Sequence, residues 1–174
     1  MLVTTPADVV VRRARTGDVS EIRAIVEGYA EDMILLAKDL VTLYEDVPDF
    51  RVAVNSDGDV VGCGAIHVMW EDLAEVRTLA VLPQYRGHGI GRRILDELVT
   101  TAYELGVERV VCLTFATGFF GGQEFEVADS VAVAPDVFIQ MVRSADEGIA
   151  EFLDLERVRP NTLGNTRMVR ILQR

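Results

Sequence analysis

The stretch VLPQYRGHGIGRR, residues 81–93, is the most informative part of this sequence of 174 residues. Its alternate positions Gly87, Gly89 and Gly91 leave the backbone uncovered by side chains. Because glycine adopts conformations that other residues avoid, successive N–H groups of such a turn can converge. A helix that begins after the turn adds its own unpaired N–H groups and the positive end of its dipole. The stretch therefore predicts an anion cradle, between a strand and a helix, that suits a pyrophosphate.

The charge of this turn supports the same interpretation. Arg86, Arg92 and Arg93 lie in it, and residues 82–93 contain no acid, although the net charge of the chain is −11. No Gly-Lys-Ser/Thr follows the glycines, which excludes a P-loop, and the spacing is not the GxGxxG of a dinucleotide-binding turn. The alternative is a glycine-rich turn with solvated arginines, and the strand before it and the helix after it weigh against that alternative.

Hydrophobic periodicity predicts the elements around the turn. Strands are predicted at 9–13, 50–55, 60–70, 75–81, 109–114 and 166–172, and helices at 19–29, 34–45, 89–105 and 135–144. Asp18 and Glu21 have the spacing of a capping box, Asp57-Gly58 is typical of a hairpin turn, and Gly106 is placed to end the long helix. This order indicates an α+β fold, a central mixed sheet flanked by helices, rather than a doubly wound α/β fold.

Length and composition narrow the class of protein. We expect a flexible N-terminal tail over residues 1–8 and a single domain over residues 9–174. Apolar residues make up 49% of the chain, enough for a buried core. The net negative charge argues against nucleic acid as a partner. Because the sequence has no apolar run of about 18 residues and no signal peptide, we expect no membrane contact and a cytoplasmic location.

The cysteines and histidines argue against a metal site. Cys63 and Cys112 lie in apolar, strand-like runs and are interpreted as reduced core thiols rather than a disulfide. No CxxC-type zinc site occurs, and the two histidines, His67 and His88, are too few for a His-rich site. We therefore expect no metal.

The segment Gln84-x-x-Gly87-x-Gly89, preceded by Leu79-Ala80-Val81, resembles the acetyl-CoA motif of the GCN5-related N-acetyltransferases (GNAT). The order of elements agrees with that fold across most of the chain. The resemblance implies acetyl-CoA as co-substrate, with the backbone of Leu79 and Val81 contacting its acetyl and pantetheine arm. The residues that it implies for acetyl-CoA binding are Leu79, Ala80, Val81, Arg86, Gly87, His88, Gly89, Ile90, Gly91 and Arg92.

A narrower resemblance points to the acceptor. The stretches VGCGAIH (61–67), EVRTLAV (75–81) and LTFATGFF (113–120) resemble the acetyltransferase domain of N-acetylglutamate synthases, and ILLAK (34–38) and LGNTR (163–167) extend the match. It is closest to the short actinobacterial form that lacks an amino-acid-kinase-like domain. The resemblance implies transfer of the acetyl group of acetyl-CoA to L-glutamate, giving N-acetyl-L-glutamate for arginine biosynthesis. A homodimer is an expectation from the family.

The resemblance also implies catalytic roles for two residues. Acetyl transfer needs a neutral amine, and an α-amino group is largely protonated at neutral pH, so a base helps. That role falls on Glu75; strand alternation predicts that Glu75, Arg77, Leu79 and Val81 share one side. The alternative is a solvent-facing acid paired to Arg77. Thr114 is implied as the acid that protonates the leaving thiolate, and it alternatively only finishes a strand edge.

A dicarboxylate acceptor needs fixed cations. The resemblance implies Lys38, Arg77, Asn165 and Arg167 as substrate-binding residues, with Arg77 and Arg167 beside one cleft. For each, pairing with one of the many acids is the alternative.

Two positions depart from the family pattern. Gly164 stands where an arginine is expected, and Glu124 stands where glycine is usual. The absence of the arginine at Gly164 bears on the identity of the acceptor. Glu124 bears on the conformation of the loop after Phe120. Two other functions therefore stay open: acetylation of a different amine (glutamine, a polyamine or a protein amine), which the acidic surface favours for cationic acceptors, and non-catalytic sensing of acyl-CoA.

Overall fold

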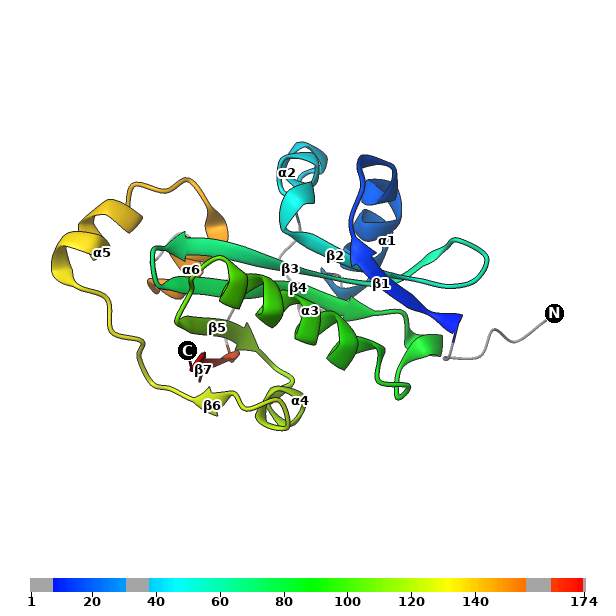
Figure 1. Cartoon of the computed structure of the whole chain (residues 1–174). Coiled ribbons are helices and arrows are strands. Elements are labelled where there is room, and N and C mark those ends of the chain that lie inside the picture. The colour runs from blue at the N-terminus through cyan, green and yellow to red at the C-terminus, as the bar shows by residue number, and fades with distance from the viewer. Residues whose placement is uncertain (1–7, 31–37, 156–163, 174) are drawn as a thin grey trace.

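A mixed sheet organises the fold in the computed structural model, which describes residues 8–30, 38–155 and 164–173 (Figure 1). Seven strands of these residues pair in the order β1-β2-β3-β4-β5-β7-β6. They are β1 (Val10–Arg13), β2 (Phe50–Val54), β3 (Val60–Trp70), β4 (Leu73–Val81), β5 (Arg109–Thr114), β6 (Glu126–Val127) and β7 (Thr166–Ile171). Only β4 and β5 pair in parallel among them. The predicted α+β fold with a mixed sheet is confirmed.

Helices cover both faces of this sheet (Figure 1). On one face the long helix α3 (Ile90–Glu104) buries apolar side chains at helical spacing, such as Ile94, Leu98 and Ala102. On the opposite face α1 (Val19–Ala30) packs through Ile22 and Val26, with α2 (Leu40–Glu45) beside it. The remaining helices are α4 (Thr117–Gly121), α5 (Pro135–Met141) and α6 (Glu147–Phe152).

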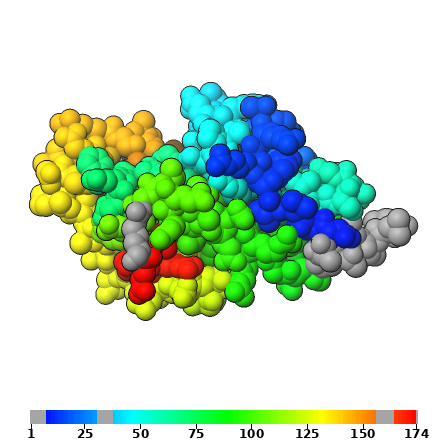
Figure 2. Space-filling view, in the orientation of Figure 1, coloured from blue at the N-terminus to red at the C-terminus, as the bar shows by residue number. Residues whose placement is uncertain are grey.

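The helix α6 covers the far end of the face that carries α1 and α2. Ile149 and Phe152 of α6 pack with Leu73 of β4 and Val111 of β5 in a small apolar cluster. In Figure 2 the outline of the molecule dips between the α2 region and the region of α5 and α6. The sheet face between α2 and α6 is where the charged residues of the candidate site gather.

Two features of β4 shape the site. Cys63 pairs with Ala80 and Ala65 pairs with Arg77, so that two steps along β3 oppose three along β4. This β-bulge includes Thr78, whose φ is 57°. Moreover, β4 pairs with β5 only from Leu73 to Glu75, whereas β5 pairs with β7 along its whole length. The two central strands therefore separate beyond Glu75 and leave a gap in the sheet.

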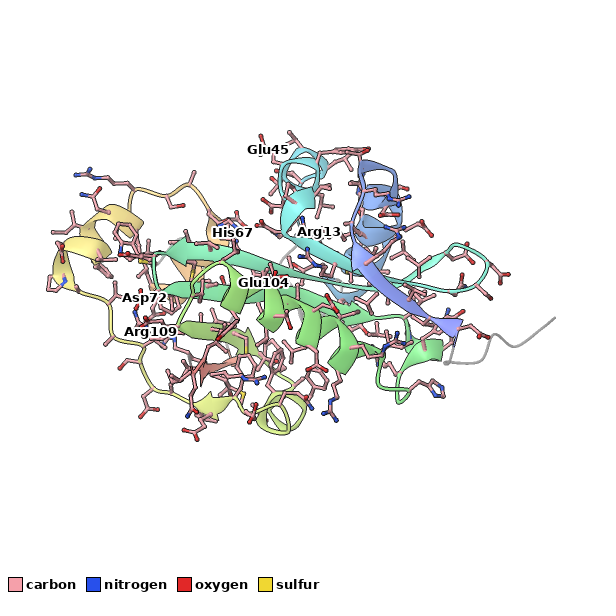
Figure 3. All side chains as sticks on the ribbon, viewed as in Figure 1. Arg13, Glu45, His67, Asp72, Glu104 and Arg109 are labelled. Atoms are coloured by element: carbon pink, nitrogen blue, oxygen red, sulfur yellow. The ribbon has the colours of Figure 1, made fainter. Side chains whose placement is uncertain are left out.

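The paired end of β4 and β5 is held by side-chain and backbone contacts. Arg109 forms an ion pair with Asp72 at 2.8 Å, and the two residues lie together in Figure 3. The backbone N–H groups of Glu108 and Arg109 also donate to the Asp72 carbonyl. The strands are thus fastened at one end and open at the other.

The predicted strands and the long helix agree with the structure to within two residues at each end. The predicted helix at 135–144 is α5, which ends at Met141. The predicted helix at 34–45 is seen only as α2, because residues 31–37 lie outside the described part of the chain, as do residues 1–7 of the predicted tail. The sequence analysis missed α4, β6 and α6.

The capping box expected at Asp18 and Glu21 is wrong. A short 3₁₀ turn, Thr16–Asp18, leads into α1, so Asp18 faces back toward the preceding chain. Its carboxylate accepts from the Arg15 N–H at 2.7 Å and pairs with Arg12, whose hydrogen bond lowers the pKa of Asp18. Glu21 instead accepts from the N–H of Val60 on β3, at 3.1 Å. Both acids therefore tie α1 to the sheet.

Other local predictions are confirmed. Gly58 has a φ of 92° in the turn between β2 and β3, and Gly106 has a φ of 94° after α3. Cys63 and Cys112 are buried and unbridged, and burial raises the pKa of Cys63 to about 12. Within the described ranges, none of the helices combines the length and apolar character that a membrane crossing requires.

Candidate active site

The gap between β4 and β5 is a cleft with a volume of about 390 Å³. Its wall is mainly apolar. It includes six residues that the sequence analysis selected: Leu79, Ala80, Val81, Arg86, Gly91 and Thr114. Tyr29, Phe119 and Phe120 also line it, whereas Gly87, His88, Gly89, Ile90 and Arg92 do not. A long, narrow organic group with few charges fits such a cleft.

Backbone groups of β4 face this cleft. The Leu82 N–H donates to the Val61 carbonyl at 2.9 Å, which makes the neighbouring pair of Gly62 and Val81 a non-hydrogen-bonded one. The N–H and C=O of Val81 therefore point away from β3. Leu79 lies in the bulge and has no partner residue in β3. The Val81 N–H thus points to the β5 side, while its carbonyl accepts from the Tyr29 hydroxyl. The ligand contacts that the sequence analysis expected from Leu79 and Val81 stay a prediction.

The expectation that Glu75, Arg77, Leu79 and Val81 share one side of the strand is wrong. Leu79 and Val81 pack against the apolar cluster that contains α3. Arg77 lies on the opposite face, against α6. The extra residue of the bulge at Thr78 reverses the alternation of side chains between these pairs. The strand thus presents charged groups to one face and apolar groups to the other.

The glycine turn has the backbone that the sequence predicts. Gly87 and Gly89 have φ values of 78° and 75°, and Gly89 is the N-cap of α3. The first hydrogen bond of α3 runs from the Arg93 N–H to the Gly89 carbonyl, so the N–H groups of residues 90–92 have no partner within the helix. Ile90 is 1% exposed and offers only its N–H. These N–H groups and the helix dipole create a positive end toward the cleft.

Arg86, His88 and Arg92 of the turn differ in how firmly they are placed. Arg86 donates to the Tyr29 hydroxyl at 3.0 Å and lies 5.1 Å from the centre of its ring. Tyr29 in turn donates to the Val81 carbonyl at 2.6 Å. Arg92 is 68% exposed and is 3.9 Å from Asp96, and His88 is exposed. Arg86 is therefore built into the cleft, while Arg92 and His88 are free to move toward a ligand.

Thr114 lies where β5 ends at the cleft. Its Oγ1 accepts from the Ala116 N–H at 2.9 Å, which closes the turn into α4. Its own hydroxyl hydrogen stays available for donation into the cleft. Thr114 thus closes a turn at the end of the strand, as the alternative interpretation has it, and also lines the cleft. Its role as the acid stays a prediction.

A second group of functional candidates lies on the opposite face of β4. Glu75 is 3% exposed and is the last residue of β4 that pairs with β5. Its Oε2 accepts from Nε of Arg77 at 2.6 Å. The pairing with Arg77 agrees with the alternative interpretation of Glu75, but the carboxylate is buried rather than solvent-facing.

Arg77 joins β4 to α6. Its two terminal nitrogens donate to the Asp146 carboxylate at 2.9 and 2.7 Å. Asp146 is also the N-cap of α6, because its Oδ1 accepts from the Ile149 N–H at 2.8 Å. Burial raises the pKa of Asp146, but hydrogen bonding and charge from Arg77 outweigh it and lower that pKa to about 2. Three nitrogens of Arg77 are thus held by carboxylates, so it is not free to bind a substrate carboxylate in this arrangement.

A glycine allows this close approach of α6. A Cβ at Gly148 would lie 2.4 Å from Cζ of Arg77. The guanidinium cannot move aside without breaking its contacts with Glu75 and Asp146. Asp146 and Gly148 position Arg77, and the sequence analysis missed both. The signal in the sequence was Asp146 itself, an N-cap residue directly before the helix at 147–152.

Asn165 and Arg167 also meet α6. The Asn165 amide donates to Oε1 of Glu151 at 2.6 Å. Arg167 donates to the backbone carbonyls of Phe152 and Asp129 at 2.8 and 2.9 Å, and its buried Nε has no partner in the described part of the chain. Burial, followed by the charge of Glu75, raises the pKa of Glu151 to about 7. Glu151 is a further residue that the sequence analysis missed.

Lys38 lies at the α2 end of this face. Its Nζ is 2.8 Å from Asp46, and His67 Nδ1 is 2.9 Å from Asp49. One ligand atom each from Asp46, Asp49 and His67 lie within 4.8 Å of one another, a geometry that could hold a metal ion. These groups already pair with each other and with Lys38. His67, which is labelled in Figure 3, lies on β3 opposite Glu75 in the β3–β4 register.

The two departures from the family pattern have backbone explanations. Glu124 has a φ of 65°, a conformation that favours the glycine usual at this position, and its carboxylate pairs with Arg170. Gly164 has a φ of 98°, so the backbone here disfavours the arginine expected. Phe125 is buried against Phe120, which keeps the loop after α4 packed.

Comparisons with known proteins agree with this geometry. Residues 20–121 match the model of the acetyltransferase (GNAT) family. The chain is 53% identical over 165 residues to an amino-acid acetyltransferase of Mycobacterium tuberculosis, covering 94% of each chain.

Two solved structures are similar as well. A crystal structure of a Mycobacterium tuberculosis protein in complex with CoA and NLQ has 53% identity and a TM-score of 0.91, over 94% of this chain and 99% of that one. An N-acetylglutamate synthase of Neisseria gonorrhoeae, complexed with coenzyme A and N-acetyl-glutamate, has 26% identity and a TM-score of 0.75, over 95% of this chain and 35% of that one.

Proposed function

The chain belongs to the acetyltransferase (GNAT) family, and on that premise we propose that it transfers the acetyl group of acetyl-CoA to the α-amine of L-glutamate. The observation that carries the proposal is the cleft between β4 and β5, which opens beside the glycine turn and begins where the pairing of the two strands ends at Glu75. The similarity to an amino-acid acetyltransferase and to an N-acetylglutamate synthase supports an amino acid as acceptor.

The residues of the turn fit the charged part of acetyl-CoA. The N–H groups at the start of α3 and the Arg86 guanidinium would hold the pyrophosphate, with Arg92 adding a mobile charge. The apolar wall formed by Val81 and Phe119 would hold the pantetheine arm. The backbone N–H of Leu79, which lies in the bulge, would face the thioester carbonyl.

The chemistry then needs positioning and charge stabilisation. The neutral amine attacks the thioester carbonyl, and a backbone N–H of the bulge stabilises the oxyanion that develops there. Glu75, the last residue of β4 that pairs with β5, is the proposed base for the amine. The C–S bond then breaks, and the proton that leaves the nitrogen would reach the thiolate through the hydroxyl of Thr114, which lines the cleft. Both cysteines are buried, which argues against an acyl-enzyme.

A second acceptor class is favoured by the charges on the α6 face. Arg77 is engaged by Glu75 and Asp146, and Lys38 by Asp46. A site whose cations are compensated in this way selects weakly for a second carboxylate. An amino acid with a neutral side-chain amide, such as glutamine, is therefore the second candidate.

An acceptor screen tests the proposal. Coenzyme A release would be measured with glutamate, glutamine, aspartate, a polyamine and a lysine-rich peptide at equal concentration. The proposal expects the highest kcat/KM with glutamate and places glutamine second. Preference for the polyamine or the peptide would contradict it, and turnover with none of them despite coenzyme A binding would indicate a sensor.

A further inference from the structure

Tyr29 is a wall residue of the cleft whose hydroxyl the proposed reaction does not use. It lies in the last turn of α1, is half-buried, and its ring packs against the apolar cluster that contains Ile25, Val26 and Ala80. Its hydroxyl contacts the end of β4 and the glycine turn, which follow it by 52 and 57 residues in the sequence. The packing of its ring and these two contacts fix the side chain at both ends.

The chemistry of the partners fixes the direction of each hydrogen bond at this hydroxyl. A backbone carbonyl only accepts, so the one hydrogen of the Tyr29 hydroxyl goes to the Val81 oxygen at 2.6 Å. A guanidinium only donates, so Nε and Nη2 of Arg86 use the lone pairs of the same oxygen. The three groups form one chain of hydrogen bonds from Arg86 through Tyr29 to Val81, and bonds in such a chain strengthen one another.

The ring of Tyr29 adds a second contact to the same guanidinium. The central carbon of Arg86 lies 5.1 Å from the centre of the ring, within the range of a cation–π interaction. Arg86 is otherwise an exposed side chain, and within the described ranges it makes no hydrogen bond or ion pair to another side chain. The direction of its guanidinium therefore depends on Tyr29.

The neutrality of this anchor distinguishes Arg86 from the other cations of the molecule. Arg77 and Lys38 are held by the carboxylates of Asp146 and Asp46, which compensate their charge. Tyr29 fixes Arg86 without supplying a negative charge, so the positive charge remains available for an anion. A cation that is already oriented also loses less conformational entropy when the anion binds.

We propose that Tyr29 is a positioning residue for acetyl-CoA, whose hydroxyl, fixed by the Val81 carbonyl, aims the Arg86 guanidinium at the diphosphate. The inference rests on the proposed function and deepens it, since it assigns to α1 a part in holding the acetyl donor. Tyr29 acts through Arg86 and takes no part in acetyl transfer itself. It therefore affects the affinity for coenzyme A and leaves the chemical step unchanged.

Titration of Tyr29→Phe with coenzyme A tests the inference. The variant keeps the ring and its packing and removes only the hydroxyl. The affinity for coenzyme A should fall about 5-fold, the effect of one lost hydrogen bond. In the enzyme assay the KM for acetyl-CoA should rise by the same factor, while kcat and the KM for the acceptor stay at the wild-type values. Unchanged affinity, or a loss in kcat alone, would overturn the inference.

Tyr85→Phe is the matched control. Tyr85 precedes Arg86 directly in the sequence, but its hydroxyl receives a hydrogen bond from the Asn55 amide at 3.3 Å, and it is not one of the residues that line the cleft. Its removal should leave the affinity for coenzyme A at the wild-type value. An equal loss in the two variants would mean that any disturbance beside the turn weakens binding, and would overturn the role of Tyr29.

A double-mutant cycle shows whether Tyr29 acts through Arg86. In the Arg86→Ala background the hydroxyl has no guanidinium to hold, so Tyr29→Phe should then change the affinity for coenzyme A less than about 2-fold. The same loss in both backgrounds would mean that the hydroxyl acts on the ligand in another way, and would overturn the inference. Thermal unfolding of each variant verifies that the affinities are compared between folded proteins.

A measurement on the wild-type protein needs no variant to fold. In ¹H–¹⁵N spectra the Nε–H of Arg86 should exchange slowly with water and shift when coenzyme A is added. A signal like that of a free arginine would overturn the inference.

The two proposals fail in different ways. If coenzyme A binds in a manner that depends on Tyr29 but no amino acid is acetylated, the acceptor assignment is wrong and the role of Tyr29 stands. If amino acids are acetylated and the affinity for coenzyme A does not depend on Tyr29, only the inference is wrong.

Discussion

The two faces of β4 differ in the kind of groups that they present. On the side of the cleft, the turn at 86–91 offers backbone N–H groups and an arginine that is close to solvent. On the other side, Glu75, Arg77 and Asp146 lock together in a buried network that fixes α6. The first arrangement depends on backbone conformation, and the second depends on side-chain charges that compensate one another. Substitutions should therefore affect ligand affinity on the first side and stability on the second.

The largest effect is expected for Arg77→Ala. Removing the guanidinium leaves the buried carboxylate of Glu75 and the half-buried carboxylate of Asp146 without their cation, which should reduce the free energy of unfolding by about 3–5 kcal/mol. Arg23→Ala is the control, because it removes an exposed pair with Glu27 and should cost no more than about 0.5 kcal/mol. Urea denaturation measures both. Equal losses of unfolding free energy in the two variants would contradict the contrast between the two faces of β4.

The next effect concerns Gly89. A side chain at its φ of 75° is strained, so Gly89→Ala should reduce stability by about 1–2 kcal/mol and weaken acetyl-CoA binding as the turn shifts. Gly28→Ala, in the interior of α1 with open space around it, should instead stabilise by about 0.5–1 kcal/mol. Thermal unfolding and coenzyme A titration test the pair. Unchanged stability and coenzyme A affinity in Gly89→Ala would mean that the turn can adopt a different backbone conformation.

A smaller effect on stability but a clear one on affinity is expected for Arg86→Ala. Loss of a charge-assisted hydrogen bond to phosphate, worth about 1.5–3 kcal/mol, should weaken coenzyme A binding about 10-fold or more. Arg143→Ala, an exposed arginine at the end of α5, should leave the affinity unchanged. Calorimetry at two salt concentrations would compare them. Equal affinities of both variants would exclude Arg86 from the anion site.

The smallest effect is expected for Glu124→Gly. Glycine relieves the positive φ at this position, a gain of about 1 kcal/mol, while loss of the exposed pair with Arg170 offsets part of it. The variant should be slightly more stable and bind coenzyme A as before. A marked loss of stability would show that the ion pair outweighs the backbone strain.

The contrast between the two faces of β4 also explains which part of the site the sequence predicts. The glycine turn and its arginines are a local signal, because positive φ and helix starts leave their mark on neighbouring residues such as Gly87 and Gly89. The strands around it follow from apolar runs, and 60–70 and 109–114 agree with the structure end to end. The glycine turn could be predicted because its residues lie in one continuous segment of the sequence.

The other face could not be predicted in the same way. The bulge falls at Thr78, a β-branched residue that gives no sign of a positive φ, and it reverses the side of every later residue in β4. The network of Arg77 needs Asp146, which is 69 residues away along the chain. The short helix α6 has too few apolar positions to stand out from its surroundings.

A crystal structure with coenzyme A bound is the most direct test of the central claim, that the opening between β4 and β5 is the acetyl-CoA site. The account predicts the diphosphate on the N–H groups at the start of α3 beside Arg86, and the thiol near the bulge at Thr78. A diphosphate bound on another surface, with the opening between the two strands left unfilled, would contradict it.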